Sequence, residues 1–399
     1  MNSTPSAPVV LAATLTVQSL VAMALLTLPV IAPAVAESMQ ISAAYVGLYI
    51  ALVYAGAMTA SLLSGGAVRR FGAIRASQFG LLLCAAGVAA CTIESPLAMA
   101  IGAVLVGLGY GPITPASSHL LAKSTPAHRM SLVFSIKQTG VPLGGVLAGV
   151  IVPSLADMVG WQWAFLAVAA ANLLCAIAIQ PLCAALDADK DSKQRLSFGN
   201  GLAGPLKLVF SHRSLTVLAA VSFLFSITQL SLTTYLVTFL HEDLSMGLIV
   251  AGFILAVAQA AGVVGRLLWG YLADRFLGAS NMLAVLAILI AACAIATALL
   301  HYTDSSLLVI VVLSVFGSSA VGWNGVYLAE VARQAPKGQA SVATGGTLAM
   351  TFLGVVIGPP LFGVVATVFG SYGLAYATLI LPAGLCLWLL MHFRATFIK

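Results

Sequence analysis

The sequence predicts an all-α integral membrane protein whose twelve transmembrane helices form two pseudo-symmetric six-helix bundles. Composition is the first observation behind this prediction. Of 399 residues, 61% are hydrophobic and only 7% are charged, whereas soluble domains carry about 25% charged residues. Because one membrane span needs about 20 apolar residues, the roughly 243 apolar residues would fill about twelve spans. The other two observations are the recurrence of apolar runs of that length and the similarity of the two halves.

Twelve apolar runs, bounded by charged or turn-forming residues, are each long enough to cross a bilayer as a helix. One long polar stretch separates the sixth run from the seventh. It divides the chain into an N-terminal six-helix bundle over 1–186, a cytoplasmic linker over 187–213 and a C-terminal six-helix bundle over 214–399. The predicted spans are 9–35, 43–64, 76–93, 96–122, 131–156, 162–184, 215–240, 246–268, 280–301, 305–330, 339–367 and 371–393.

The basic residues predict the orientation, because cytoplasmic loops carry the excess of Lys and Arg. With the N-terminus inside the cell, fifteen of the seventeen basic residues fall in cytoplasmic segments, and the outer loops carry only acidic ones. The other two are Arg266, predicted near the cytoplasmic end of span eight, and Lys137, predicted within span five. We therefore expect a multi-pass protein of the inner (plasma) membrane with both termini in the cytoplasm.

The two halves of the sequence resemble each other. The segment 65–71 after span two aligns with 270–276 after span eight at an offset of 205 residues. At an offset of 210, Gly144 aligns with Gly354 and Gly160 with Gly370. Parallel repeats of six helices are a recurrent transporter design in which the substrate site lies between the repeats near mid-membrane.

The segment 270–276 reads Gly-Tyr-Leu-Ala-Asp-Arg-Phe. It looks like the loop signature of the major facilitator superfamily (MFS), which the chain resembles over essentially its whole length. The resemblance implies gating roles for Asp274, Arg275, Arg70 and Gly270, which belong to the two copies of the signature. In the first copy, Arg69 stands where the family usually has Asp. The family's drug antiporters carry motifs on helices four and five that this sequence matches only in part, which weakens a proton-driven antiporter interpretation.

Lys137 is the one charged residue predicted well inside a span. It follows Arg129 by eight residues, about 12 Å along a helix, and a buried ammonium group costs at least a few kcal/mol unless it is paired or hydrated. Gly140 and Gly144 continue its helical face, so a solute or a neighbouring helix could approach closely. Because all eleven acids fall in loops or at helix ends, the simplest partner for Lys137 is a substrate carboxylate. The alternative is a lysine that snorkels to the cytoplasmic surface.

Polar residues at helical spacing predict which faces of the spans line a cavity. The resemblance implies that helices one, four, seven and ten surround the substrate. For most Ser and Thr residues, ordinary interhelical hydrogen bonding explains the pattern equally well. The candidate contacts beside Lys137 are Gln18, Tyr110, Thr114, Gln229, Asn324 and Tyr327.

Other functional classes lack their motifs. No Gly-Lys-Ser/Thr phosphate loop, serine nucleophile elbow or paired metal-binding histidines occur, so we expect no enzyme, cofactor or metal site. The dispersed basic residues do not predict a nucleic-acid partner.

We expect a monomeric secondary transporter in the lipid bilayer that moves a small organic anion by alternating access. The alternative is an efflux antiporter for hydrophobic drugs or metabolites. The sequence leaves open the coupling ion, the direction of transport and the exact substrate.

Overall fold

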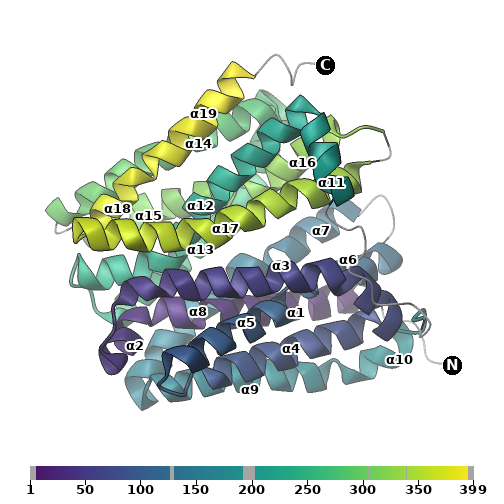
Figure 1. Ribbon diagram of the computed structural model, residues 1–399, viewed down its shortest axis with the longest axis horizontal. Coiled ribbons are helices and arrows are strands. Elements are labelled where there is room, and N and C mark those ends of the chain that lie inside the picture. The colour runs from purple at the N-terminus through teal and green to yellow at the C-terminus, as the bar shows by residue number, and fades with distance from the viewer. Residues whose placement is uncertain (1–5, 126–129, 192–202, 304, 338, 394–399) are drawn as a thin grey trace. The chain divides into compact units, whose positions relative to one another are not determined.

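The computed structural model describes residues 6–125, 130–191, 203–303, 305–337 and 339–393, and these ranges consist of helices and short connections (Figure 1). Within them, twelve helical segments are long and apolar enough to cross a membrane, which confirms the predicted number. The central part of the predicted linker, 192–202, lies outside the described residues. Five of the basic residues behind the predicted orientation also lie outside them, namely Arg129, Lys193, Arg195, Arg394 and Lys399.

The chain forms two compact units. Unit 1 comprises Met1–Met39 with Leu52–Gly199, and unit 2 comprises Gln40–Ala51 with Asn200–Lys399. The helices of unit 1 are α1 (Ala7–Val30), α2 (Ala32–Met39), most of α3 (Val46–Phe71), α4 (Ala73–Ala90), α5 (Pro96–Tyr110), α6 (Ile113–Ser124), α7 (Met130–Gln138), α8 (Gly140–Val159), α9 (Trp161–Ala178), η3 (Gln180–Leu182) and α10 (Cys183–Leu186). Here α1 packs along α8, and α4 packs against both α5 and α9.

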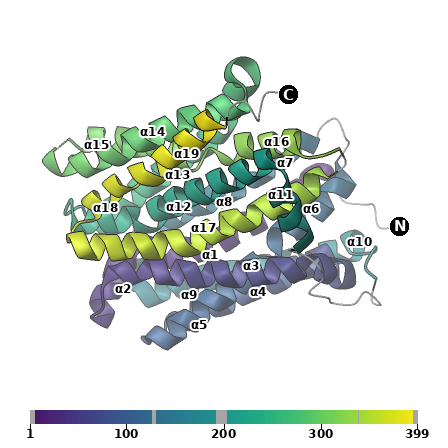
Figure 2. The same ribbon diagram turned by 45° about the horizontal axis from the view of Figure 1, so that its top comes forward.

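Unit 2 begins with η1 (Ala43–Tyr45) and the first turns of α3. The hydroxyl of Tyr235 donates to the carbonyl oxygens of Ala44 at 2.8 Å and Pro359 at 2.9 Å, which ties η1 to the helices around it. Helix α12 packs along α17, and the two lie side by side in both views (Figures 1 and 2). The other bounds are α11 (Ala203–Ser211), α12 (Arg213–Glu242), α13 (Leu248–Leu272), η4 (Ala273–Leu277), α14 (Ala279–Leu299), η5 (Leu300–Tyr302), α15 (Ser306–Ala320), α16 (Asn324–Gln334), α17 (Ala340–Phe369), α18 (Tyr372–Thr378) and α19 (Ile380–His392).

The distribution of side chains is that of a protein whose solvent is lipid. Large apolar side chains such as Trp163, Leu307 and Leu381 are exposed on the outside of the helices, whereas Gln18, Asn172 and Thr234 are buried inside. A helix can stay in hydrocarbon because its backbone N–H and C=O groups bond to each other. The polar side chains therefore collect where helices face one another.

Two spans are interrupted at corresponding places in the two units. Span four breaks between α5 and α6 at Gly111-Pro112, and span ten breaks between α15 and α16 at 321–323. Proline removes a backbone donor, which explains the first break. Gly-interrupted segments at matching positions of two repeats are a pointer to a transporter's binding site.

Two sequence predictions about helix ends are wrong. The sequence predicts that span eight ends at 268, but α13 continues to Leu272 and a helical turn, η4, carries it to Leu277. The segments 65–71 and 270–276 are predicted to follow their spans, yet both are helical. The predicted ends stand just before the glycines at 65–66 and 270, which are typical of turns, but both helices continue through these glycines to the charged residues beyond them.

The start of the predicted linker is bound to unit 1. The buried carboxylate of Asp187 accepts hydrogen bonds from the backbone N–H groups of Ile74 at 2.8 Å and Arg75 at 3.0 Å. These groups lie in the first turn of α4, where donors have no partner within the helix. Gly72 precedes α4 with a φ of 98°, and a Cβ there would collide with Asp187. Asp187 thus caps α4 from 112 or more positions away in sequence.

Replacing Asp187 with alanine is expected to lower the free energy of unfolding by about 1–2 kcal/mol, the usual loss for a helix cap. Thermal unfolding of the purified protein in detergent measures the change. Asp157→Ala removes an exposed acid of unit 1 and is the matched control. Equal melting temperatures for the two variants would contradict the capping role.

Asp189 ties the same segment to span four. Its Oδ2 lies 2.6 Å from Lys123 Nζ and 2.8 Å from His119 Nε2. Partial burial opposes ionisation of the carboxyl, but the hydrogen bonds from Lys123 and His119 outweigh it and lower the pKa of Asp189 below its usual value.

Because the pKa of Asp189 is lower in the folded than in the unfolded protein, its contribution to stability is present at neutral pH and disappears as pH falls through the folded value. The three groups are partly exposed, so Asp189→Asn is expected to remove no more than about 1 kcal/mol. Unfolding measured from pH 7 down to pH 3 should show wild type and variant converging below about pH 4. A difference that grows as pH falls would contradict this.

Candidate functional site

Lys137 is buried inside unit 1. It lies in the last turn of α7, one residue before the helix ends at Gln138, and α8 begins after Thr139. Its side chain is 1% exposed, and its Nζ donates to the hydroxyl of Thr114 at 3.3 Å. This exposure does not fit a lysine whose ammonium group snorkels to the membrane surface.

A short hydrogen-bonded chain leads from Lys137 to Gln18. Thr114 follows the break in span four, accepts from Lys137 and donates its own proton to Gln18 Oε1 at 3.3 Å. The Gln18 side chain is 0% exposed, and its Nε2 has no hydrogen-bond partner among the described residues. Since Nε2 is purely a donor, both ends of the chain, the ammonium group and the amide nitrogen, present N–H groups. The arrangement is chemically suited to a ligand that only accepts, such as a carboxylate.

Glycines next to Lys137 let α8 approach α1. A Cβ at Gly140 would lie 2.8 Å from Gln18 Cγ, and one at Gly144 would collide with the backbone carbonyl of Ser19. The sequence left either a solute or a neighbouring helix possible beside Gly140 and Gly144, and the structure places helix α1 there. The same packing holds Gln18 beside the Lys137 turn.

Tyr110 is the last residue of α5, just before the break in span four. Its ring lies 6.1 Å from the ring of Tyr54, centroid to centroid. Tyr110 thus packs against another aromatic ring. It is not a member of the hydrogen-bonded chain that Lys137, Thr114 and Gln18 form.

In unit 2, the predicted amides meet at the break in span ten. Gln229 Oε1 accepts from Trp323 Nε1 at 2.9 Å and from Asn324 Nδ2 at 3.2 Å. Trp323 is completely buried, and its ring contacts those of Phe225 and Tyr327 at centroid distances of 5.4 and 5.2 Å. Two amides and a cluster of aromatic rings therefore share one location.

The hydroxyl-bearing residues mostly serve the helices themselves. Ser222 and Thr233 bond to carbonyls of their own helix, and Ser226 also reaches Thr351 O on α17 at 2.9 Å. Tyr327 is buried, and its hydroxyl has no hydrogen-bond partner among the described residues. Most of these hydroxyls thus bond within their own helix, and Ser226 is the case that matches the expected interhelical bonding.

Arg266 is the residue whose position the sequence misjudged. Because α13 and η4 run to Leu277, Arg266 lies eleven residues, about 16 Å, before the helix end rather than near it. Its Nε donates to the carbonyl oxygen of Val321 at 3.2 Å. Asn324 Nδ2 reaches the same oxygen at 3.4 Å. A signal was present in the sequence, since Gly317 and Gly322 mark the interruption in span ten that leaves this carbonyl outside a helix.

Arg266→Ala is expected to lower the free energy of unfolding by about 1–3 kcal/mol, because the Val321 carbonyl would keep only the long bond from Asn324. Thermal unfolding checks this, with the exposed Arg275→Ala as control. A loss no greater than that of the control would show that Arg266 does not support the break.

The gating candidates lie at helix ends. Asp274 and Arg275 are exposed in η4 and form no ion pair within the ranges the structure describes. The guanidinium carbon of Arg70 lies 5.4 Å from the ring centre of Phe71. A Cβ at Gly270 would meet no atom within 4 Å. Their gating roles remain predictions.

In the part of the chain that the structure describes, twelve apolar spans enclose buried polar side chains, and two of the spans are interrupted at corresponding positions. These features define a multi-pass membrane protein of the transporter class. The chain belongs to the Major Facilitator Superfamily, whose family model matches residues 14–359. The family and the characterised relatives are transporters and not enzymes.

Three relatives carry names that state a substrate. The benzoate transport protein of Acinetobacter baylyi is 24% identical over 291 residues, 65% of this chain and 60% of the relative. The gentisate transporter of Corynebacterium glutamicum is 26% identical over 311 residues, 73% of this chain and 67% of the relative. The hexuronate transporter of Bacillus subtilis is 27% identical over 157 residues, 38% of this chain and 36% of the relative. The match thus spans less than two thirds of the benzoate transport protein's length.

Solved structures share the fold. A bacterial homologue of the human lysosomal transporter Spinster, inward-facing and unoccupied, has a TM-score of 0.74 at 16% identity, covering 99% of this chain and 97% of the other. The D-xylose–proton symporter has a TM-score of 0.74 at 16% identity, covering 96% of both chains. Both support the predicted fold class.

Proposed function

We propose that this protein is a secondary transporter that moves a small organic anion with a carboxylate group across the inner membrane by alternating access. The observation that carries the proposal is the buried chain of Lys137, Thr114 and Gln18. It presents a buried ammonium group and a buried amide N–H group, two donors that suit the acceptor oxygens of a carboxylate. Charge-assisted hydrogen bonds from such donors to a carboxylate are about twice as strong as neutral ones.

The names of the relatives support an anionic substrate. Benzoate, gentisate and hexuronate all carry a carboxylate group, and their named transporters share 24–27% identity with this chain. In unit 2, the hydrogen-bonded Gln229 and Asn324 beside Trp323 and Tyr327 would serve the uncharged part of the substrate. Tyr110, beside the break in span four, is the remaining proposed contact.

The orientation belongs to the same proposal. Both termini face the cytoplasm, and Asp274, Arg275, Arg70 and Gly270 act at the cytoplasmic ends of their helices in gating. The charge asymmetry of the loops supports this orientation. Labelling of single cysteines introduced at Lys207 and at Glu94 with a membrane-impermeant reagent on intact cells should modify only the second.

The transport proposal is tested by uptake into proteoliposomes. The panel contains benzoate, gentisate and a hexuronate, with a neutral sugar and a hydrophobic cation for comparison. Saturable uptake of at least one carboxylate, accelerated by the same compound on the opposite side, is the expected result. Transport of the hydrophobic cation without any carboxylate would favour the drug-efflux alternative instead. Imposed proton and sodium gradients on the same vesicles identify the coupling ion.

A further inference from the structure

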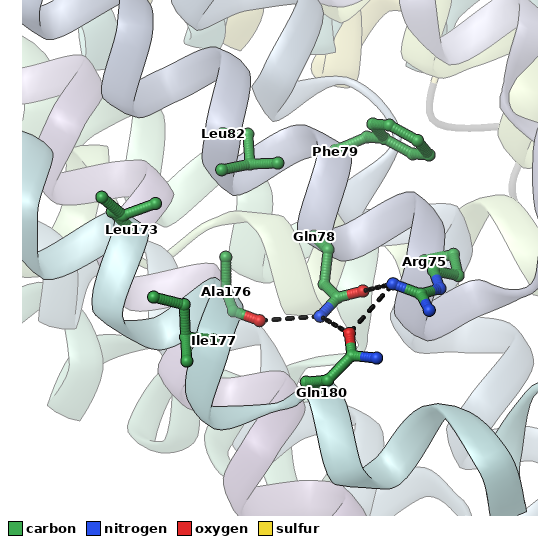
Figure 3. A pocket seen from close by; sticks show the side chains of 8 residues that line it. All are labelled: Arg75, Gln78, Phe79, Leu82, Leu173, Ala176, Ile177 and Gln180. Carbon is green, nitrogen blue, oxygen red and sulfur yellow. Dashed lines mark hydrogen bonds between the residues drawn. The ribbon is translucent and has the colours of Figure 1, made fainter.

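A groove runs along unit 1 between α4 and α9, at the end where the chain turns from α3 into α4. Figure 3 shows it lined by the apolar side chains of Phe79, Leu82, Leu173 and Ile177, with Arg75 at its mouth. Its volume is about 270 Å³. A second hollow of about 450 Å³ adjoins it and shares Arg75 and Phe79.

The guanidinium group of Arg75 is held in place. Its Nη1 donates to Gln78 Oε1 at 3.0 Å and to Gln180 Oε1 at 2.9 Å. Gln78 is itself fixed, because its Nε2 donates to the carbonyl of Ala176 at 2.7 Å and to Gln180 at 2.8 Å (Figure 3). These bonds use one of the two terminal nitrogens, and the guanidinium carries five N–H groups in all. The others remain for an anion.

The second hollow is basic. Arg70 and Lys190 line it together with Arg75. Of the acids nearby in sequence, Asp187 is directed into the backbone of Ile74 and Arg75. Asp191 is exposed at the end of the segment and bonds through its backbone N–H to the Arg69 carbonyl. Asp189 is bound by Lys123 and His119. Three cations thus line the hollow. Of the three neighbouring acids, Asp187 and Asp189 are already bonded and Asp191 is exposed.

The apolar part of the groove belongs to membrane-spanning helices. Phe79 is 57% exposed and Ile177 is 61% exposed, on spans three and six. Exposed apolar surfaces on membrane-spanning helices contact acyl chains. An apolar groove that ends at basic side chains therefore suits a phospholipid, whose acyl chain is apolar and whose headgroup is anionic. Basic pockets between helices at the cytoplasmic face bind such headgroups.

We propose that this groove binds one anionic phospholipid. Its phosphate is bound by Arg75, Arg70 and Lys190, and an acyl chain lies along Phe79, Leu82, Leu173 and Ile177. The planar guanidinium of Arg75 matches the phosphate geometry, and its two glutamine partners hold it ready for binding. The site is separate from Lys137 and does not depend on the proposed substrate.

The test uses the purified full-length protein in nanodiscs of phosphatidylcholine with increasing phosphatidylglycerol. Bound phosphatidylglycerol is counted by native mass spectrometry, and melting temperature is recorded in parallel. The double variant Arg75→Gln/Lys190→Gln is expected to bind phosphatidylglycerol about fivefold more weakly for each cation removed. Lys207→Gln removes an exposed cation of α11 and should leave binding unchanged. Equal weakening by Lys207→Gln would overturn the proposal, because it would show a diffuse charge effect.

Two further comparisons distinguish a bound lipid from a free anion and from a purely structural arginine. Ile177→Trp fills the apolar groove and is expected to reduce phosphatidylglycerol binding without any change in charge. Inorganic phosphate is expected to leave the melting temperature of wild type unchanged. Stabilisation by phosphate as large as that by phosphatidylglycerol would overturn the proposal. A double variant that loses the same stability in pure phosphatidylcholine and in phosphatidylglycerol would also overturn it, because Arg75 would then be purely structural.

Discussion

Substitution of Lys137 by alanine is expected to reduce carboxylate transport at least about 30-fold. This follows because truncating one partner of a buried, hydrogen-bonded charge pair costs about 2 kcal/mol or more. The ammonium group lies at the buried end of the chain through Thr114 to Gln18, and no other basic side chain belongs to that chain. Initial rates of uptake into proteoliposomes, measured over a range of substrate concentrations, give the ratio of maximal rate to half-saturating concentration.

Lys207→Ala is the matched control for this experiment, because it removes an exposed lysine from α11. Lys137→Arg keeps the charge with a different shape and should retain more activity than alanine. Gln18→Leu should raise the half-saturating concentration with a smaller effect, since an uncharged donor is lost. If Lys137→Ala folds and transports the carboxylate like wild type, the lysine is not the anion contact.

Substitution of Gly107 or Gly317 by alanine is expected to destabilise the protein by about 1–3 kcal/mol, the usual effect of overpacking. A Cβ at Gly107 would collide with the carbonyl oxygen of Val53 in unit 1, and one at Gly317 with the carbonyl oxygen of Ala258 in unit 2. Backbone atoms cannot rotate aside as a flexible side chain can, so the helices must separate. Thermal unfolding in detergent measures both effects.

Gly345→Ala is the matched control, because its Cβ would meet no atom within 4 Å in the helix α17. It should be neutral or stabilise by up to about 1 kcal/mol, since alanine favours helix over glycine. Stability equal to that of Gly345→Ala in both glycine variants would show that the close approach of these helices is not required.

Hydropathy, charge pattern and the loop signature at 270–276 were sufficient to predict the number of spans, the fold class and the family, all of which the structure and the comparisons confirm. The membrane makes this possible, because a run of apolar residues in lipid must be helical. The ends of helices were predicted less well. At α13, the predicted span stops at 268, just before Gly270, which is nine residues before the helical structure ends at Leu277.

The candidate site was predicted only as a set of residues. Charge and polarity single out Lys137, Gln18 and Thr114, but their mutual hydrogen bonds depend on α1, α6 and α7 packing together. The sequence predicted that either a solute or a helix lies beside Gly140. In the structure, α1 packs against this face. Spacing groups Tyr327 with Asn324, yet the ring of Tyr327 packs against Trp323 and its hydroxyl bonds to neither amide among the described residues.

The sequence alone determined that this protein lies in a membrane and consists of transmembrane helices. Each apolar run can be read locally, and a run that crosses the bilayer must form a helix. What only the tertiary structure decided is which polar groups meet. The bond between Arg266 and Val321, the capping of α4 by Asp187 and the bond between Arg75 and Gln180 all join residues at least 55 positions apart. Such contacts depend on how helices rotate and pack against each other, and hydropathy carries no information about that rotation.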